Sequence, residues 1–131
     1  MSNTKAEIAA ALRVAADSLR RGADAAEFGA LLYTPELVVV GESWPRSIRG
    51  FAAFKSDLQA LIDGWGPNPD LTFSIVDPVI EGGDTATTIA DVFVAPKKAA
   101  DPGEHYRVMY AWIRTARGWR VAVEMYTVGS F

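Results

Sequence analysis

The chain has 131 residues, of which 50% are hydrophobic and 22% are charged, and its net charge is −3. This length and composition fit one globular domain over residues 1–131 and are too short for two ordinary domains. With no cysteine and one histidine, the chain excludes disulfides, thiolate chemistry, Cys-based zinc sites and multi-histidine metal centres.

The first part of the chain predicts two helices. A capping pattern at Thr4–Glu7 begins the first helix, and apolar residues recur at helical spacing through 8–19. A second capping pattern, Asp24–Glu27, begins a shorter helix that the Thr-Pro pair at 34–35 stops.

A strand, a turn and a third helix are predicted next. The β-branched run within Glu36–Glu42 is typical of a buried strand, and 46–49 predicts a short returning strand. Gly50 precedes a helix whose apolar residues form a regular stripe over 51–65, and glycines and prolines of 64–69 end it.

The rest of the chain predicts antiparallel strands. They are Leu71–Glu81 with an interruption at Pro78, Thr85–Ala95, Tyr106–Thr115 and Trp119–Val128. The last two form a hairpin about the tip 116–118. The sequence therefore predicts an α+β domain with its helices gathered on one face of the sheet.

The last hairpin presents two different faces. If 116–117 are its tip, strict alternation places these residues on one large apolar face: Val108, Tyr110, Trp112, Trp119, Val121, Val123 and Met125. We expect that face to lie under the helices. The opposite face is mixed and comprises Arg107, Met109, Ala111, Ile113, Arg120, Ala122, Glu124 and Tyr126. It predicts a homodimer contact with a charged rim, and the alternative is a half-exposed sheet surface.

Four stretches of the chain resemble a known superfamily. They are Leu31–Val40, Ile48–Phe51 before the third helix, Gly83–Ala86 opening a strand, and Gly118–Val121 opening the last strand. In order and spacing they resemble the nuclear transport factor 2-like (NTF2-like) superfamily, which includes ketosteroid isomerase-like and SnoaL-like proteins. The resemblance implies a cone, in which a curved antiparallel sheet wraps around about three N-terminal helices with a pocket at the wide end. Such proteins are commonly dimers.

The resemblance also implies which positions to inspect. In the isomerases a carboxylate base follows the first strand, where Glu42 is the nearest acid, and an acid on the penultimate strand corresponds to Tyr110. The tyrosine that the isomerases carry on helix 1 is missing, so ketosteroid isomerisation itself is not expected. Relatives with histidines on the last strand have them where this chain has Val123 and Met125, which implies a more apolar pocket.

Four polar side chains are candidates for chemistry. Glu42 beside aromatics could be a general base with a raised pKa, or a solvated strand end. Tyr110 could donate to a carbonyl or enolate oxygen, or could be a core tyrosine. Asp91 could face the pocket as an acid–base group, but the resemblance favours turning it toward the dimer face, where it could pair with Arg107 or Arg120. His105, at the start of a strand, is more typical of surface.

Aromatic side chains supply the candidate walls of the pocket. Trp112 is expected to line its interior. Trp44, Trp65 and Tyr33 could form its mouth, although each of these three is equally consistent with core packing. Val123 and Met125 would form its base.

These observations predict a protein that binds a small, largely apolar organic molecule. If it is an enzyme, the expected class is isomerisation, cyclisation or dehydration without a cofactor, with Glu42 as base and Tyr110 as oxyanion donor. The alternative is a non-catalytic binding or assembly domain. A cavity of roughly 300 Å³ or more with Glu42 or Asp91 in its wall would favour the enzyme, and a filled cone the alternative.

Other function classes are disfavoured by missing patterns. The chain shows no basic stripe for nucleic acid and no glycine-rich phosphate loop. It has no apolar run near the ~20 residues of a membrane span, and its start lacks the zones of a signal peptide. We therefore expect a cytoplasmic protein.

Overall fold

A computed structural model describes residues 3–42, 44–76, 79–129 and 131. Its helices are α1 (Thr4–Arg20), α2 (Ala25–Leu32) and α3 (Phe51–Gly64). Its strands are β1 (Tyr33–Gly41), β2 (Ile48–Arg49), β3 (Leu71–Ile75), β4 (Ile80–Gly82), β5 (Thr85–Val94), β6 (Glu104–Thr115) and β7 (Gly118–Val128). The predicted α+β class is confirmed.

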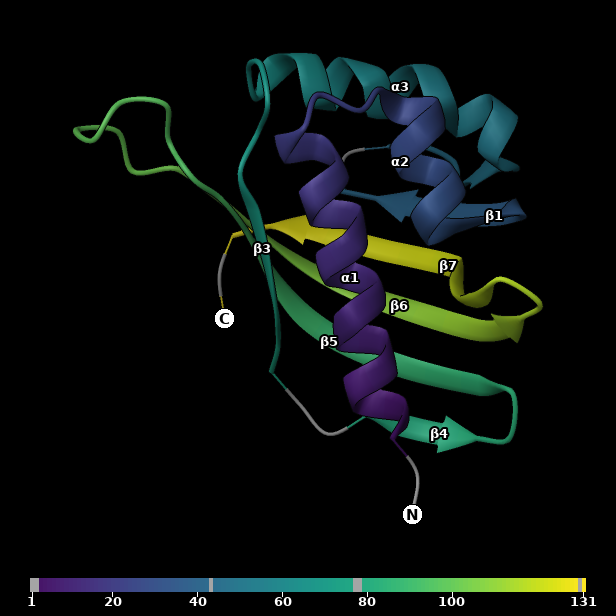
Figure 1. The fold of residues 1–131 in the computed structure, drawn as a ribbon. Coiled ribbons are helices and arrows are strands. Elements are labelled where there is room, and N and C mark those ends of the chain that lie inside the picture. The colour runs from purple at the N-terminus through teal and green to yellow at the C-terminus, as the bar shows by residue number, and fades with distance from the viewer. Residues whose placement is uncertain (1–2, 43, 77–78, 130) are drawn as a thin grey trace.

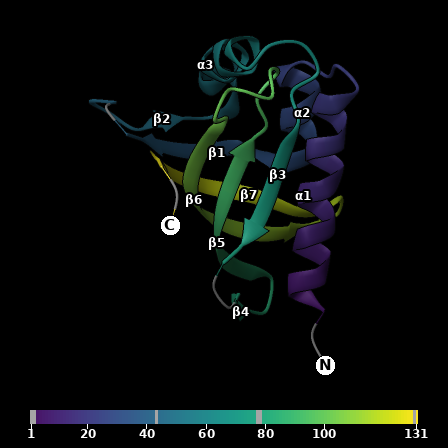
Figure 2. The same ribbon diagram turned by 90° about the vertical axis from the view of Figure 1, so that its left-hand side faces the viewer.

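The strands form one curved sheet with the three helices on its concave side. The sheet order is β2-β1-β7-β6-β5-β3, with β4 also paired to β5. Figure 1 shows α1 lying across the sheet and α3 running along its upper edge, and Figure 2 shows the curvature from the side. All pairs are antiparallel except β1 with β7, which the long connection through the rest of the chain permits.

The predicted strand over 71–81 is divided in two. β3 pairs with the C-terminal half of β5, whereas β4 pairs with its first residues. Both therefore lie along the same edge of β5. Pro78, where the interruption was predicted, lies outside the described residues.

Local sequence explains how the helices begin and meet. Asp24 caps α2 as predicted, because its Oδ1 accepts a hydrogen bond of 2.9 Å from the Glu27 amide. For α1 the prediction was one residue late, since Asn3 rather than Thr4 is the N-cap. Helix α2 lies close to α3 at Gly29, where a Cβ atom would come within 2.1 Å of the Phe51 ring.

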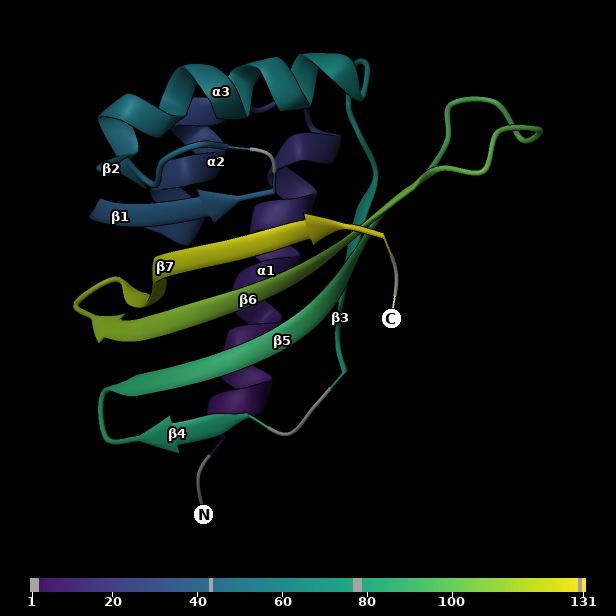
Figure 3. The same cartoon turned by 180° about the vertical axis from the view of Figure 1, so that it is seen from behind.

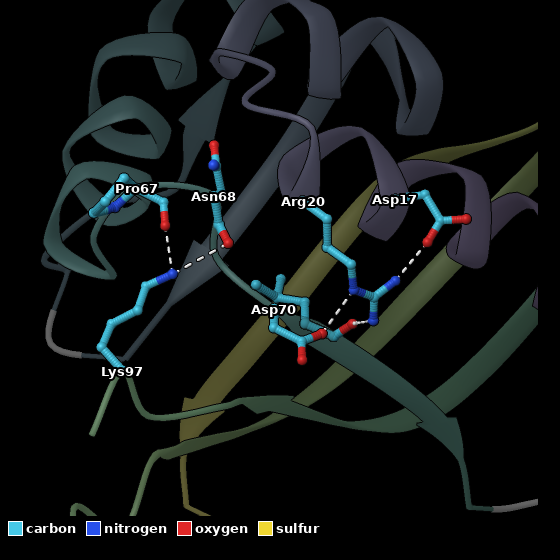
Figure 4. Close-up of polar contacts among 7 residues, drawn as sticks. Asp17, Arg20, Pro67, Asn68, Asp70 and Lys97 are labelled. Carbon is cyan, nitrogen blue, oxygen red and sulfur yellow. Dashed lines mark hydrogen bonds and ion pairs between the residues drawn. The ribbon is translucent and has the colours of Figure 1, made fainter. Parts of the chain in front are cut away.

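The end of α1 is fastened to β3 by Arg20. Its Nε donates to Asp70 Oδ1 at 2.7 Å, one terminal nitrogen donates to the Leu71 carbonyl at 2.9 Å, and the other pairs with Asp17 (Figure 4). These groups are largely exposed, so the ion pairs orient the helix more than they stabilise it.

The core lies between the helices and the inner face of the sheet. Its largest fully buried side chains are Trp112, Phe54, Ile8, Leu12, Leu19, Leu32, Leu37, Val39 and Val121. Burying such side chains provides the main driving force of folding, at about 1.5–3 kcal/mol each. No helix in the described parts of the chain combines the length and apolarity needed to cross a membrane.

A β-bulge in β7 changes which residues face inward. Trp112 pairs with Val121, but the preceding Ala111 pairs with Val123, so Ala122 is an extra residue. Beyond this point inside and outside exchange, because side chains alternate along a strand. The prediction that Val123 and Met125 face the helices is therefore wrong. They lie on the outer face, 36% and 44% exposed, while Glu124 points inward.

Among the residues that the structure describes, no helix covers the outer face of the sheet. Figure 3 shows this face from behind, with α1 and α2 on the far side of the strands and α3 along the upper edge. Its exposed apolar residues are Val40, Met109, Ile113, Val123 and Met125. They lie on the neighbouring strands β1, β6 and β7. Met125 of β7 is directly paired with Val40 on one side and with Met109 on the other.

Candidate functional site

A small apolar cavity lies between the inner face of the sheet and helices α2 and α3. Its volume is about 60 Å³. The lining residues are Phe28, Tyr33, Phe54, Leu58, Leu61, Trp65, Leu71, Phe73, Val92, Tyr106, Val108, Tyr110, Glu124 and Tyr126. Glu124 is the one carboxylate among them, so any acid–base chemistry in this cavity has a single candidate.

Glu124 is a buried carboxylate held by a tyrosine. Its residue is 6% exposed, and its Oε1 accepts a hydrogen bond of 2.8 Å from the Tyr33 hydroxyl. Burial raises its pKa from 4.5 to about 7, because the charged form loses its hydration, and the Tyr33 hydrogen bond offsets part of that rise. At neutral pH this carboxyl is therefore divided between its acid and its base form.

Two buried phenols accompany the carboxylate. Burial raises the pKa of Tyr33 and that of Tyr110 well above 10, and the nearby charge of Glu124 raises both further. Both phenols therefore stay protonated and can act as donors, while Glu124 is the group that changes charge.

Folding brings these three groups together from distant parts of the chain. Tyr33 is the first residue of β1, directly after α2, and lies opposite Val121 on β7. Tyr110 and Glu124 are direct partners across the β6–β7 ladder. Tyr110 faces the cavity by simple alternation along β6, and the bulge in β7 turns Glu124 to the same side. The three positions are thus fixed by backbone pairing rather than by flexible loops.

The cavity adjoins a wider vestibule at its mouth. This vestibule measures about 340 Å³ and shares Leu61, Trp65, Tyr106 and Tyr126 with the cavity. Its other lining residues are Trp44, Asp57, Ala60, Gly64 and Glu104. A ligand could therefore place its bulk in the vestibule and its tip in the cavity, next to Glu124.

Glu42, the predicted base, lies outside the cavity. Its side chain is exposed, and its Oε2 accepts a hydrogen bond of 2.7 Å from the Val128 amide. That bond ties the end of β1 to the end of β7. The geometry therefore gives Glu42 a structural contact in place of a position beside the ligand.

Asp91 lies on the outer face, as the resemblance favoured. Ala90 and Val92 are buried on the inner side, and Asp91 carboxylate oxygens lie 3.2 Å from His105 Nδ1. Asp91 is directly opposite Arg107 on β6. Asp91, His105 and Arg107 thus form a charged group at the rim of the outer face.

The predicted aromatic residues separate into two sets. Tyr33, Tyr110 and Trp65 line the cavity, and Trp44 lines the vestibule. Trp112 is 1% exposed, donates from Nε1 to Thr88 Oγ1 at 2.9 Å, and belongs to the solid core. Val123 and Met125, predicted to form the base of the pocket, lie on the opposite side of the sheet.

Glu124 is the residue that sequence reasoning missed. Strict alternation placed it on the outer face, and a bulge at Ala122 has no local marker such as a glycine or proline. The cavity is also smaller than the roughly 300 Å³ that would have favoured an enzyme, and neither Glu42 nor Asp91 lines it, so by this criterion it is closer to a filled cone. The described residues include no group of three or more acidic or histidine side chains that could hold a metal.

Comparisons with known proteins place the fold. No family model matches the chain, and no curated protein matches it in sequence. Solved structures do match it. A protein of unknown function with a cystatin-like fold from Nostoc punctiforme superposes with a TM-score of 0.78 at 15% identity, over 98% of this chain and 93% of that one.

Two further structures carry the superfamily name. An NTF2-like protein with a cystatin-like fold from Novosphingobium aromaticivorans has a TM-score of 0.67 at 20% identity, over 96% and 83% of the two chains. A ketosteroid isomerase-like protein from Erwinia carotovora atroseptica has a TM-score of 0.71 at 19% identity and covers both chains fully. The resemblance found in the sequence is confirmed for the fold, and at these identities it conveys no activity.

Proposed function

We propose that this protein, which has the NTF2-like, cystatin-like fold, binds a small and largely apolar organic molecule and moves a proton on it with Glu124. The observation that supports this is the carboxylate with a pKa of about 7 in the wall of an apolar cavity. A base is most effective when its pKa is near the working pH, and burying a carboxylate without a use is costly.

The proposed reaction begins with removal of a proton from carbon. Ionised Glu124 takes a proton from the carbon next to a carbonyl group, and the electron pair moves to the carbonyl oxygen. Tyr110, a protonated phenol beside Glu124, donates a hydrogen bond to the enolate oxygen. The proton on Glu124 then returns to another carbon in an isomerisation, or to a leaving hydroxyl in a dehydration. In a cyclisation the enolate carbon attacks a second carbonyl, whose π electrons move to its oxygen, and Glu124 returns its proton to that alkoxide.

Glu124 replaces Glu42 in this proposal because of position. Glu42 is exposed and accepts the Val128 amide, whereas Glu124 is buried next to two phenols. Asp91 faces away from the cavity and is assigned no step. The ketosteroid isomerase-like description of one structural neighbour agrees with the reaction class and adds nothing about the substrate.

A titration tests the chemical basis of the proposal. Carboxyl signals of the ¹³C-labelled protein should include one that titrates near pH 7, and Glu124→Gln should remove it. The control is Glu42→Gln, which should leave that signal in place. A Glu124 carboxyl that titrates near 4.5 would overturn the proposal.

A proton-exchange assay tests the activity itself. Cyclopentanone is a small ketone, and exchange of its α-protons in D₂O reports removal of a proton from carbon. The protein should accelerate this exchange with a rate that rises through pH 7, and Glu124→Gln should reduce the rate by about 100-fold. The control variant Glu42→Gln should exchange the α-protons at the same rate as the parent protein. Equal rates in the protein and in Glu124→Gln would refute a catalytic role.

A non-catalytic binding domain is the alternative that the small cavity favours. In that case cyclopentanone exchange stays at the buffer rate, while an apolar ligand still displaces solvent from the cavity and quenches tryptophan fluorescence. The two assays therefore separate a ligand carrier from an enzyme.

We also propose a homodimer through the outer face of the sheet. This face is apolar at its centre, has a hollow of about 350 Å³ beside Met109 and Met125, and carries both an acid and a base at its rim. A face with both signs of charge can pair with a second copy of itself about a twofold axis. Sedimentation should show a dimer that Met125→Glu converts to a folded monomer, and Val14→Glu on α1 is the matched control. A monomeric parent protein would refute the dimer.

A further inference from the structure

Four aromatic rings surround the vestibule. Trp44 and Tyr126 meet edge to face at 5.5 Å, Tyr126 and Tyr106 at 6.1 Å, and Tyr106 and Trp65 at 6.0 Å between ring centroids. The rings come from the connection after β1, the end of α3, and strands β6 and β7. They form one continuous row around a hollow of about 340 Å³, within the usual size range of small-molecule sites.

The backbone is shaped to let these rings approach. Gly41, the last residue of β1, lies beneath two of them. A Cβ atom at this position would come within 2.7 Å of the Trp44 ring and 2.9 Å of the Tyr126 ring. Any larger residue would push the rings apart, so the row depends on glycine here.

Two carboxylates face the same hollow. Glu104 is held in place by two hydrogen bonds to its Oε2, one of 2.9 Å from Trp65 Nε1 and one of 2.8 Å from the Tyr106 hydroxyl. Asp57 lines the hollow from α3. Among the described residues neither carboxylate has an ion-pair partner, and no lysine, arginine or histidine lines the vestibule.

Lys97 approaches the end of α3 but does not line the vestibule. Its alkyl chain lies near Gly66, and its ammonium donates to the carbonyls of Pro67 and Asn68 (Figure 4). It is therefore held by the backbone outside the vestibule, and the negative charge of the hollow is left for a ligand to balance.

The charge of the vestibule contrasts with that of a groove at the other end of α3. That groove, of about 770 Å³, is lined by Lys55, Arg117 and Arg120 and by no carboxylate among the residues described. The protein thus separates its charges, with cations at the N-terminal end of α3 and acids with aromatic rings near its C-terminal end.

We propose that the vestibule binds an organic cation, a protonated amine or quaternary ammonium group, whose apolar remainder reaches toward the cavity. Aromatic faces attract such cations through their quadrupoles, and the carboxylates add direct charge attraction. This proposal rests on the proposed function, since it names the substrate class of the same site. The raised pKa of Tyr126, about 12, agrees with it, because burial and then the nearby acids Glu124, Asp57 and Glu42 all disfavour further negative charge there.

Other ligand classes fit this hollow less well. An anion would meet two carboxylates with no cation to receive it. A metal ion would need several oxygen ligands, and the described residues contain no group of three or more acidic or histidine side chains that could hold one. A neutral apolar molecule would fit the rings but would leave the charge of Glu104 and Asp57 unused.

The probe is benzyltrimethylammonium, compared with neopentylbenzene, its neutral counterpart of the same shape, and with phenylacetate. Binding is measured by tryptophan fluorescence and calorimetry. The protein should bind the cation about tenfold more tightly than the neutral compound and should not bind phenylacetate measurably.

Variants locate the site. Glu104→Gln should weaken binding of the cation about fivefold and leave that of neopentylbenzene unchanged, and Asp57→Asn should act in the same direction. Glu36→Gln, an exposed acid on β1, removes the same charge elsewhere and should have no effect. Equal affinity for cation and neutral compound, or equal weakening by Glu36→Gln, would overturn the proposal.

The result is independent of the proton-transfer assays. Glu124→Gln should keep the preference for the cation while losing cyclopentanone exchange. If the protein prefers the cation but does not accelerate cyclopentanone exchange, the cation site stands and the catalytic role of Glu124 is refuted. If it accelerates exchange but does not prefer the cation, the catalytic role stands and the cation site is refuted.

Discussion

The two halves of β7 on either side of its bulge perform different tasks with the same backbone. Before Ala122, the inward residues Trp119 and Val121 belong to a dry apolar core with Trp112 of β6. After it, the inward residues are Glu124 and Tyr126, which line the cavity. One extra residue therefore separates a region devoted to stability from a region with the means for chemistry.

The difference shows how a sheet can hold a carboxylate inside. Without the bulge, Val123 and Met125 would fill the inner face and Glu124 would reach water. With it, Glu124 is buried opposite Tyr110, at a cost in stability that the apolar half of the hairpin can offset.

The largest expected effect is in the dry half. Trp112→Ala should lower the free energy of unfolding by about 3–5 kcal/mol, because it leaves a cavity and removes the partner of the Thr88 hydroxyl. Trp65→Ala, at the mouth, should cost about half as much, since Trp65 is only partly buried. Urea unfolding measures both, and equal costs would contradict the division into two regions.

The next largest effect is a pH dependence of the free energy of unfolding, which comes from Glu124 in the half of β7 after the bulge. The unfolded chain ionises Glu124 near pH 4.5, whereas the folded chain keeps its proton until about pH 7. The folded state therefore binds more protons in this window, so this group makes stability fall as pH rises from 4.5 to 7, by about 3 kcal/mol, and no further above.

Glu124→Gln should remove that fall. The difference in unfolding free energy between the variant and the parent should grow from pH 4.5 to pH 7 in favour of the variant. Urea denaturation at several pH values gives this difference, and a constant difference would show that Glu124 is not buried as described.

A matched pair of valines sharpens the position of the bulge. Val121→Ala should cost about 2 kcal/mol because Val121 is fully buried, whereas Val123→Ala should cost less than about 1 kcal/mol because Val123 is 36% exposed. Strict alternation would make the two costs similar. Urea unfolding of the two variants at low protein concentration measures them.

The smallest effect concerns Tyr33. Its hydroxyl stabilises the ionised form of Glu124, so Tyr33→Phe should raise the pKa of that carboxyl by about one unit. The ¹³C titration described above measures it. Tyr126→Phe should serve as control, because its hydroxyl is not the donor to Glu124, and an unchanged titration in Tyr33→Phe would contradict the hydrogen bond.

Several features of the site were within reach of the sequence. Helical spacing and β-branched runs located the helices and main strands to within a few residues. The resemblance placed Tyr110 in the pocket region and turned Asp91 outward. These predictions hold because each depends on local periodicity or on an element order that the chain itself displays.

What the sequence determined is the set of elements, because helix stripes, caps and turns act between residues close together in the chain. Only the tertiary structure decided on which side of the sheet Glu124 lies and which residues surround it. At Ala122 the pairing of β7 shifts register against both of its neighbours, β6 and β1. The hydrogen bond to Tyr33 joins residues 91 positions apart. Such a contact is set by three-dimensional packing, which no short pattern of residues records.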